Sequence, residues 1–308
     1  MPRAITVVTV THDAEEHVDR MLDSVRAALP HAPVIAVDNA SSDGTAAKLR
    51  SREAVTVLEQ TNSGYAHGLN RGIERATAQH DVLVLNPDVV LHRDVGLLLG
   101  RVLDDEPDVG IVVPSLQAPD GVGLPSLGRE PTVWRMLVET VVGGSRAGRF
   151  GEAYRPPSDG RQVDVDWATG AAMLLRRRMV EQQGGFDESF FLYSEETEYC
   201  LRVRDAGWGV RCEPAAVVSH VGGALDRDPQ LWALRAVNRV RLQRQRAGRF
   251  GGLAFRLASL GFEVRRVVIG SPSARVACRS LVRSDLDRAA VELAAELGAD
   301  VAPMIRRD

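Results

Sequence analysis

Short β-branched runs alternate with amphipathic stretches of helical periodicity between Ile5 and Pro114 of this 308-residue chain. This alternation is typical of βαβ units, because two parallel strands need a long crossover connection that is usually a helix. It predicts strands at Ile5–Val10, Val34–Asp38, Val55–Glu59, Val82–Leu85 and Gly110–Val113. It predicts helices at Glu16–Leu29, Thr45–Ser51, Gly68–Ala78 and Asp94–Asp104. The sequence therefore predicts an α/β fold with a Rossmann-like, mostly parallel central sheet flanked by helices.

The pattern changes in Ser115–Gly160, which is rich in Gly and Pro and holds one apolar helix candidate at Val133–Val142. Long irregular segments inside compact domains are commonly lids or binding loops. Regular patterning then resumes, with a strand at Ala171–Leu175, a helix at Ser194–Ala206 and a strand at Ala216–His220. We therefore expect the sheet domain to occupy residues 1–223.

Residues 224–308 are expected to form a C-terminal helical extension, with helices at Pro229–Ala247 and Leu253–Val268 and a last helix from Ser284, where Ser-Asp-Leu-Asp resembles a capping box. An arginine run without acids precedes an apolar stripe in this region. The run is Arg235, Arg239, Arg241, Arg244, Arg246 and Arg249, and the stripe is Leu253, Leu257, Leu260, Val264 and Val267. Such a basic, amphipathic tail can lie on an anionic membrane surface or contact another subunit. The alternative is a solvated basic helix followed by a core-facing helix.

Composition excludes several broad classes. A hydrophobic content of 44% allows one substantial core, and a net charge of -3 gives no overall attraction to nucleic acid. Three widely spaced cysteines favour a reducing cytosol over a disulfide framework. We see no signal peptide and no apolar run near the ~20 residues of a membrane span, so a cytoplasmic protein is expected.

Polar residues follow three of the predicted strands, at the edge where parallel sheets bind ligands. These residues are Asp38, Asn62 and Asp88. Pro87 holds Asp88 at a strand tip, which is a good place to bind a divalent cation against a diphosphate. The chain lacks both G-x-G-x-x-G and the P-loop motif, so phosphate must be neutralised in another way. A Gly-rich entry to a helix, Asn62–Gly72, offers backbone N–H groups to an anion.

Several ordered motifs resemble the family 2 inverting glycosyltransferases of GT-A fold. They are VTVTHDA, VDNASSDGT, NSGYAHGLNRG, NPDVV, WATGAAML, GGFDESFFLYSEETEYCLRVRDAGW and VSHVGG, and they cover Ile5 to Gly223. Ser126–Pro131 resembles a short segment of bacterial rhamnosyltransferase-like enzymes that build cell-surface polysaccharide. The resemblance implies a GT-A nucleotide-sugar-binding and catalytic domain.

The resemblance also implies site residues. Glu196 matches the position of the catalytic base. Asn86-Pro87-Asp88 is similar to the family's D-x-D, with Asp88 as the metal ligand, His220 as a second ligand and Mg or Mn as the cation. Trp167 and Glu195 are expected to face the acceptor. The expected donor-binding residues are Thr11, Asp38, Asn39, Asp43, Asn62, Gly64, Asn70, Asn86 and Gly170.

Structural explanations compete with these roles. Asp38 and Asp43 can cap turns, and Glu195 and Glu196 can favour the first turn of a helix through its dipole. Asp88 can be a loop acid, His220 a hydrogen-bonded structural residue and Trp167 a core residue.

The leading hypothesis is therefore an inverting, metal-assisted transfer of a sugar, with rhamnose as one candidate, from a dTDP- or UDP-linked donor to a glycan or lipid-linked acceptor at the inner face of the cell membrane. A galactofuranosyl or other hexosyl transferase is an alternative, as is a catalytically silent sugar-nucleotide-binding subunit. A nucleic-acid binder acting through the arginine run is disfavoured by the acidic total charge. A homodimer stays open.

Overall fold

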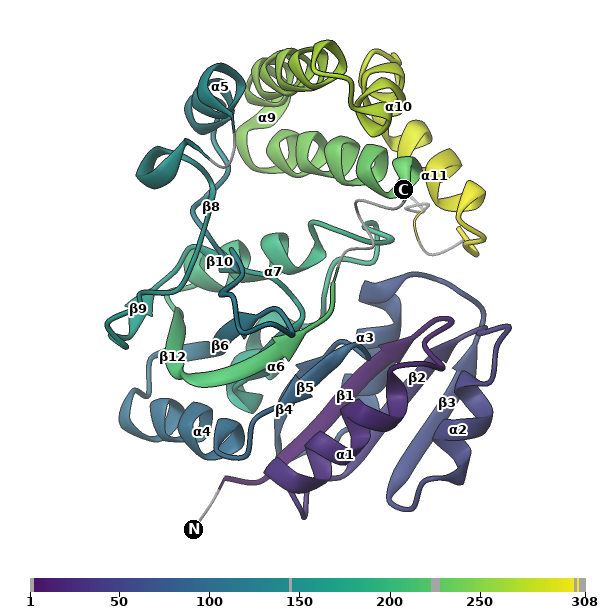
Figure 1. The fold of residues 1–308 in the computed structure, drawn as a ribbon, viewed down its shortest axis with the longest axis vertical. Coiled ribbons are helices and arrows are strands. Elements are labelled where there is room, and N and C mark those ends of the chain that lie inside the picture. Colours follow the sequence, from purple (N-terminus) through teal and green to yellow (C-terminus); the bar gives the residue numbers. More distant parts are fainter. Residues whose placement is uncertain (1–2, 144–145, 223–227, 302–303, 305–308) are drawn as a thin grey trace.

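The central sheet of this computed structural model has mixed but mostly parallel strands (Figure 1). The structure describes residues 3–143, 146–222, 228–301 and 304. Within them, nine strands join the sheet: β1 (Ile5–Thr11), β2 (Val34–Asn39), β3 (Val55–Gln60), β4 (Asp81–Leu85), β5 (Val89–Leu91), β6 (Val109–Gln117), β9 (Val163–Asp164), β11 (Ala172–Leu175) and β12 (Gly209–His220). The order is β3-β2-β1-β4-β11-β6-β12-β5, and β9 pairs with β12. Strands β3, β2, β1 and β4 are parallel neighbours, whereas β11 runs antiparallel between β4 and β6.

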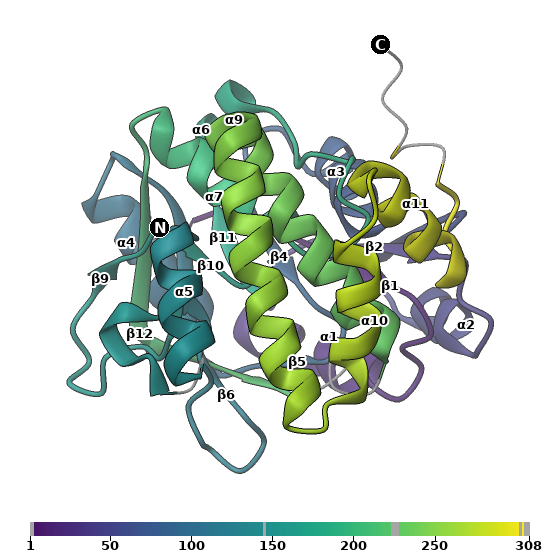
Figure 2. The same ribbon diagram turned by 90° about the horizontal axis from the view of Figure 1, so that it is seen from above.

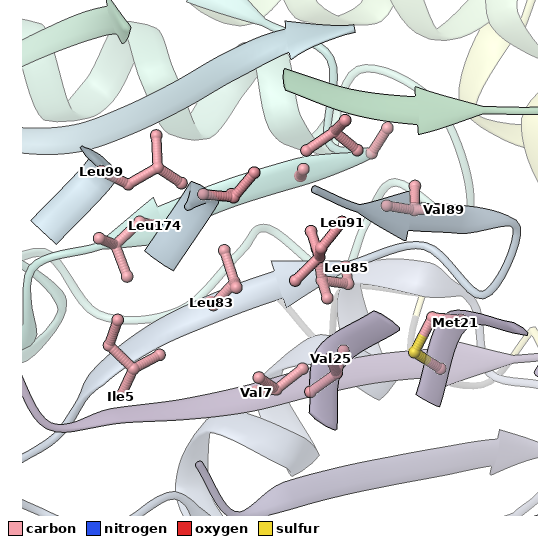
Figure 3. Close-up of a cluster of buried hydrophobic side chains, with 14 of the residues drawn as sticks. Ile5, Val7, Met21, Val25, Leu83, Leu85, Val89, Leu91, Leu99 and Leu174 are labelled. Carbon is pink, nitrogen blue, oxygen red and sulfur yellow. The ribbon is translucent and has the colours of Figure 1, made fainter. Parts of the chain in front are cut away.

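Helices cover both faces of the sheet, so its middle strands are buried on both sides. Every residue of β1, β2 and β4 is buried. Val7 and Leu83 pack with Met21 of α1 in one core cluster (Figure 3), while Val8 and Leu69 belong to the cluster on the other face. The helices are α1 (Val18–Ala28), α2 (Thr45–Ser51), α3 (Tyr65–Arg75), α4 (Val95–Asp105), α6 (Arg177–Gln183) and α7 (Glu195–Asp205).

The predicted elements up to Pro114 are all present, and the predicted α/β class is confirmed. The largest shift is at the end of β6, which runs to Gln117 instead of Val113. Helix α3 begins at Tyr65, three residues before the prediction, because Gly64 at φ 99° starts it. The irregular segment contains the predicted helix α5 (Val133–Val142) and a short helix, η2 (Gly148–Phe150). It also contributes β7 (Leu127–Gly128) and β8 (Ala153–Tyr154), which form a small antiparallel sheet with β10 (Trp167–Ala168).

A helical layer lies over the central sheet (Figures 1 and 2). It contains α9 (Pro229–Val268), α10 (Pro272–Leu281), α11 (Leu286–Glu296) and, from the middle of the chain, α5. Gly248 at φ 70° interrupts α9, so the two helices predicted there are both present. Helix α10 was not predicted, and α11 is capped by Asp285, which accepts the Arg288 N–H at 3.0 Å, instead of by Ser284. The predicted domain boundary at residue 223 lies outside the described residues and stays a prediction.

The arginine run does not form a solvated basic surface. Asn238 is 0% and Leu242 1% exposed, so the helix that carries the run faces the core. Arg239 pairs with Glu152, Arg241 with Asp287 at 2.8 Å and Arg246 with Asp205 at 2.8 Å. These acids are far away in the sequence, so the run itself could not reveal its partners. None of the described helices combines the length and hydrophobicity required of a membrane-spanning segment.

Candidate active site

Asp38 is held at the carboxyl end of β2 by the neighbouring strand and turn. Its side chain is 2% exposed. The Thr11 hydroxyl at the end of β1 donates to Oδ1 at 2.9 Å, and Ser41 donates its hydroxyl at 2.6 Å and its N–H at 3.0 Å. The predicted turn-capping role is therefore real, and it also fixes the carboxylate at the ligand edge.

The other residues of this edge that were predicted to bind the sugar donor make hydrogen bonds within the protein. Asn39 donates to the Gly64 carbonyl at 3.1 Å, and Asp43 accepts the N–H groups of Thr45 at 2.9 Å and Glu15 at 3.0 Å. The Asn62 carbonyl accepts the Asp300 N–H at 2.7 Å. For Asp43 these bonds favour the helix-capping interpretation.

Asn70 uses its whole amide to fix the loop before α7. It accepts the Phe186 N–H at 2.8 Å and donates to the Phe186 carbonyl at 2.9 Å and to Glu188 at 2.7 Å. A Cβ on Gly185 would come within 2.3 Å of the Asn70 Oδ1. We therefore leave Asn70 out of the proposed donor site.

Tyr65 lies at the centre of the site and was missed by the sequence analysis. Its hydroxyl donates to Asn86 Oδ1 at 2.7 Å and lies 3.3 Å from the Gly170 carbonyl. A Cβ on Gly170 would lie 3.5 Å from the Cβ of Glu196 and 3.7 Å from the Tyr65 ring. Three predicted site residues from different segments thus surround one ring. Its position directly after Gly64, at the start of a helix facing the ligand edge, was the available signal.

Gly64 is required by the backbone at this point. Its φ is 99°, and a Cβ there would lie 2.6 Å from the Phe191 carbonyl oxygen. Tyr65 N–H donates to the same carbonyl at 2.8 Å. Gly64 therefore allows α3 to begin against the segment that leads to α7.

Asp88 and His220 form the predicted pair at the tip of the sheet. His220 Nε2 lies 3.2 Å from Asp88 Oδ2, and the Gly222 N–H donates to the same oxygen at 3.0 Å. Antiparallel pairing of β5 and β12 sets His220 opposite Val89 and so brings the two side chains together. Burial raises the pKa of Asp88, but His220 and the Gly222 N–H outweigh it and leave the pKa below its usual value.

The Asp88–His220 pair fits a cation that is shared with a substrate. The described part of the chain has no group of three or more His, Cys, Asp or Glu residues that could hold a metal ion. Mg²⁺ commonly binds one or two carboxylates and completes its shell with substrate phosphates and water, and Mn²⁺ also prefers oxygen ligands. One carboxylate and one imidazole therefore suit a metal–diphosphate complex better than a site made by protein alone.

Glu195 and Glu196 open α7 as an acidic pair, of which Glu195 is buried and Glu196 half-buried. Glu195 is 3% exposed, and the Oε2 atoms of both residues are buried without a hydrogen-bond partner among the described residues. Burial and the charge of Glu196 raise the pKa of Glu195 well above its usual range. Burial also raises the pKa of Glu196, although nearby Arg235 opposes the rise. The charge of Arg235 therefore favours the ionised form of Glu196.

The charges of Asp88 and of the glutamate pair all act on the Tyr65 phenol. The pKa of this half-buried residue is raised well above its usual value, first by burial of the hydroxyl and then by the charges of Glu195, Glu196 and Asp88. The contacts of Tyr65 with Asn86 and Gly170, and the closeness of Gly170 to Glu196, bring together the segments that carry the predicted metal ligand and the predicted base.

Trp167 lies mainly in the core. It is 9% exposed, its Nε1 donates to the Arg129 carbonyl at 2.9 Å, and its ring fills the space where Gly128 would carry a Cβ. It also lines a cavity of about 30 Å³ between α7 and α9, with Glu196 and Arg235. A space of this size holds about one water molecule. These contacts favour the core interpretation of Trp167 over an acceptor platform.

Helix α9 holds the backbone that leads into the acidic pair. Tyr193 (φ 67°) and Ser194 (φ 79°) adopt left-handed conformations, each costing roughly 1–3 kcal/mol. Asn238 donates to the carbonyls of Leu192 at 3.0 Å and Tyr193 at 3.2 Å, and Arg241 donates to Asn238 Oδ1 at 2.8 Å. Asn238 is thus a positioning residue for Glu196 that the sequence analysis missed within the arginine run.

Replacing Asn238 with alanine is expected to lower kcat by more than about tenfold and to reduce stability by roughly 1–3 kcal/mol, because two buried carbonyls lose their donor. Gln243→Ala is the matched control. It removes another buried α9 amide, which donates to the Pro131 carbonyl at 2.6 Å, and should lower Tm while changing kcat much less. Equal losses of kcat in the two variants would show that Asn238 only stabilises the fold.

The sequence and fold can now be compared with known proteins. Residues 6–180 match the model of the family described as glycosyl transferase family 2. The chain belongs to this family. It is 30% identical over 245 residues to the N-acetylglucosaminyl-diphospho-decaprenol L-rhamnosyltransferase of Mycobacterium tuberculosis, covering 74% of this chain and 80% of the relative. It is 22% identical to rhamnosyltransferase WbbL of Escherichia coli, covering 70% and 83% of the two chains.

The fold of this glycosyltransferase matches solved structures as well. The mannosyltransferase PcManGT from Pyrobaculum calidifontis, solved with GDP-Man and Mn²⁺, superposes with a TM-score of 0.57 at 17% identity, covering 100% of this chain and 89% of that one. The predicted GT-A fold is confirmed. The predicted glycosyltransferase activity with a nucleotide-sugar donor and the likeness to rhamnosyltransferases are confirmed too.

Proposed function

We propose that this glycosyltransferase moves a hexose, with rhamnose as the first candidate, from a dTDP- or UDP-linked donor to a hydroxyl of a lipid-linked glycan. The single observation that carries the proposal is the meeting of three segments at the Tyr65 hydroxyl. It donates to Asn86, two residues before Asp88, and lies 3.3 Å from the carbonyl of Gly170, which lies beside Glu196. The rhamnosyltransferase relative whose name specifies a diphospho-decaprenol acceptor supports both the sugar and the lipid carrier. Such an acceptor implies work at the inner face of the cell membrane by a cytoplasmic, peripheral protein.

The acceptor hydroxyl is a poor nucleophile, so a carboxylate must take its proton as the new bond forms. Glu196 is proposed as this base, and protonated Glu195 can donate a hydrogen bond to it. One displacement at the anomeric carbon inverts its configuration without a covalent intermediate.

The donor is proposed to lie along the carboxyl ends of β1, β2 and β4. Thr11 and Asp38, which are hydrogen-bonded to each other, would contact the base or ribose, and Asn86 and Gly170, which share the Tyr65 hydroxyl, would contact the diphosphate and sugar. A divalent cation held by Asp88 and His220 would supply positive charge to the leaving diphosphate.

A donor screen by thermal shift tests this proposal. A ligand that binds only the folded state raises Tm with its occupancy, so the true donor should give the largest shift, and Mn²⁺ or Mg²⁺ should increase it. We expect dTDP-rhamnose to lead the screen. Transfer from that donor to a lipid-diphosphate-linked sugar would follow by product analysis. A shift without any transfer across acceptor mixtures would instead favour a silent binding subunit.

A further inference from the structure

An apolar stripe on α9 faces outward. After the break at Gly248, five large apolar side chains are exposed on one side of the helix. They are Phe250 (90%), Leu253 (52%), Leu257 (61%), Val264 (49%) and Val268 (81%). At about 100° per residue these positions fall within roughly 60° of each other. The second half of α9 does face the core, as the alternative expected, but not mainly through the predicted stripe: Phe255 and Ala258 on the opposite side make the core contact, and of the stripe Leu260 packs partly against it.

Helix α5 extends the same kind of surface. Trp134 is 66%, Leu137 44% and Val141 77% exposed, at spacings of three and four residues, while Met136 packs into the helical layer. Helix α5 lies against α9, where the Thr140 hydroxyl is 3.3 Å from the Ala258 carbonyl. Both helices belong to the outermost layer, on the side away from the central sheet (Figures 1 and 2). We call these eight side chains on α5 and α9 the outer apolar face.

The helices of this face carry arginines and no exposed acid. The stretch Arg249–Arg283 contains seven arginines and one acid, Glu263, which is 3% exposed and pairs with Arg266 at 3.0 Å. The acid of α5, Glu139, is 8% exposed and accepts the Glu152 N–H at 2.7 Å. The outer apolar face is thus accompanied by exposed arginines without an exposed acid on the same helices.

A groove joins the arginines to the apolar side chains. It lies between the end of α5 and the end of α9, and it is lined by Val142, Arg146, Arg265, Arg266 and Ile269. Apolar and cationic side chains that line one groove match a lipid, whose phosphate and acyl chain are also adjacent. Isolated exposed apolar residues need no explanation, but a periodic, two-helix face beside arginines marks an interaction surface.

We propose that the outer apolar face is a docking surface for an anionic bilayer. Helix α9 then connects two functions. Its second half contacts the membrane, and Asn238 in its first half holds the backbone before Glu196. The part of this inference that concerns a lipid-linked acceptor rests on the proposed function, whereas the docking itself does not.

The test is co-sedimentation of the full chain with vesicles of phosphatidylcholine alone and vesicles that also contain phosphatidylglycerol. We expect binding to the anionic vesicles that weakens as salt increases. The triple variant Trp134→Ser, Leu257→Ser and Val268→Ser should lose more than about tenfold in partitioning, because three side chains no longer enter the apolar layer. Leu97→Ser on α4 is the matched control, since Leu97 is 48% exposed outside this face, and it should bind like wild type.

Two results would overturn the proposal. One is equal sedimentation of wild type and triple variant with anionic vesicles, or no binding of either. The other is a wild-type dimer, by size-exclusion chromatography with light scattering, that the triple variant converts to a monomer without a change in vesicle binding. Transfer to a water-soluble acceptor without vesicles separates this inference from the catalytic proposal. The triple variant should still transfer sugar to this acceptor. If the wild-type protein does not transfer sugar to it, that result counts against the catalytic proposal and not against membrane docking.

Discussion

Glu196→Gln is expected to reduce sugar transfer by about 10²–10⁴-fold while leaving donor binding in place, because it removes the general base and keeps the size of the side chain. Steady-state rates with the donor identified by thermal shift, together with the donor-induced Tm shift of the variant, measure both effects. Glu198→Gln is the matched control. Glu198 lies on the same turn but pairs with Arg202 at 2.8 Å, so its loss should change the rate by only a few-fold.

The pH dependence of the transfer rate is an independent test of Glu196 as the base. A base must be deprotonated to work, and the pKa of Glu196 is raised by burial. Activity should therefore fall as pH decreases through this raised pKa, at a higher pH than an ordinary glutamate would require. The residual activity of Glu196→Gln should lack this acid limb. If Glu196→Gln transfers sugar at the wild-type rate, Glu196 is not the base.

Asp88→Asn is expected to lower transfer by about 10³-fold, which corresponds to several kcal/mol of leaving-group stabilisation. The amide retains the shape of the carboxylate but loses the charge that holds the cation. Wild type should be inactivated by a chelator and restored by Mn²⁺ or Mg²⁺. The variant should need far more metal, or show no response, in a titration of activity against metal concentration.

The His220 variant separates metal binding from local structure. His220→Gln keeps a hydrogen-bonding side chain near Asp88 but weakens a metal site, so it should raise the metal concentration needed for half-maximal activity more than it lowers Tm. Transfer by Asp88→Asn at the wild-type rate in the presence of chelator would refute a metal role for this pair.

The order of strands and helices was predictable because it depends on local periodicity. Apolar runs of strand length alternate with amphipathic stretches, and burial on both faces leaves no polar residue inside β4 after Asp81. The strand-end positions of Asp38 and Asp88 followed from the same pattern, since parallel strands present their carboxyl ends at one edge. The motif carrying Glu196 was recognisable in the sequence, but its burial beside Glu195 was not.

Contacts between distant segments decided the rest. The place of Tyr65 in the candidate site depends on tertiary contacts. The end of β4 and the segment before β11 bring Asn86 and Gly170 to its hydroxyl. The contact of Asn238 with the Tyr193 carbonyl likewise depends on α9 packing across the loop before α7.

The sequence by itself determined the fold class, the edge of the sheet that binds ligands and the family to which the chain belongs, because these depend on periodicity and on short ordered motifs. Only the tertiary structure decided which side of each half of α9 faces the core. The arginine run taken alone suggests a solvated surface. In the structure, Arg239 pairs with Glu152 and Arg241 with Asp287, whereas the apolar stripe that follows is exposed. The physical reason is that a helix has no inner side until its partners are in place, since burial and ion pairing are properties of contacts and not of the residues alone.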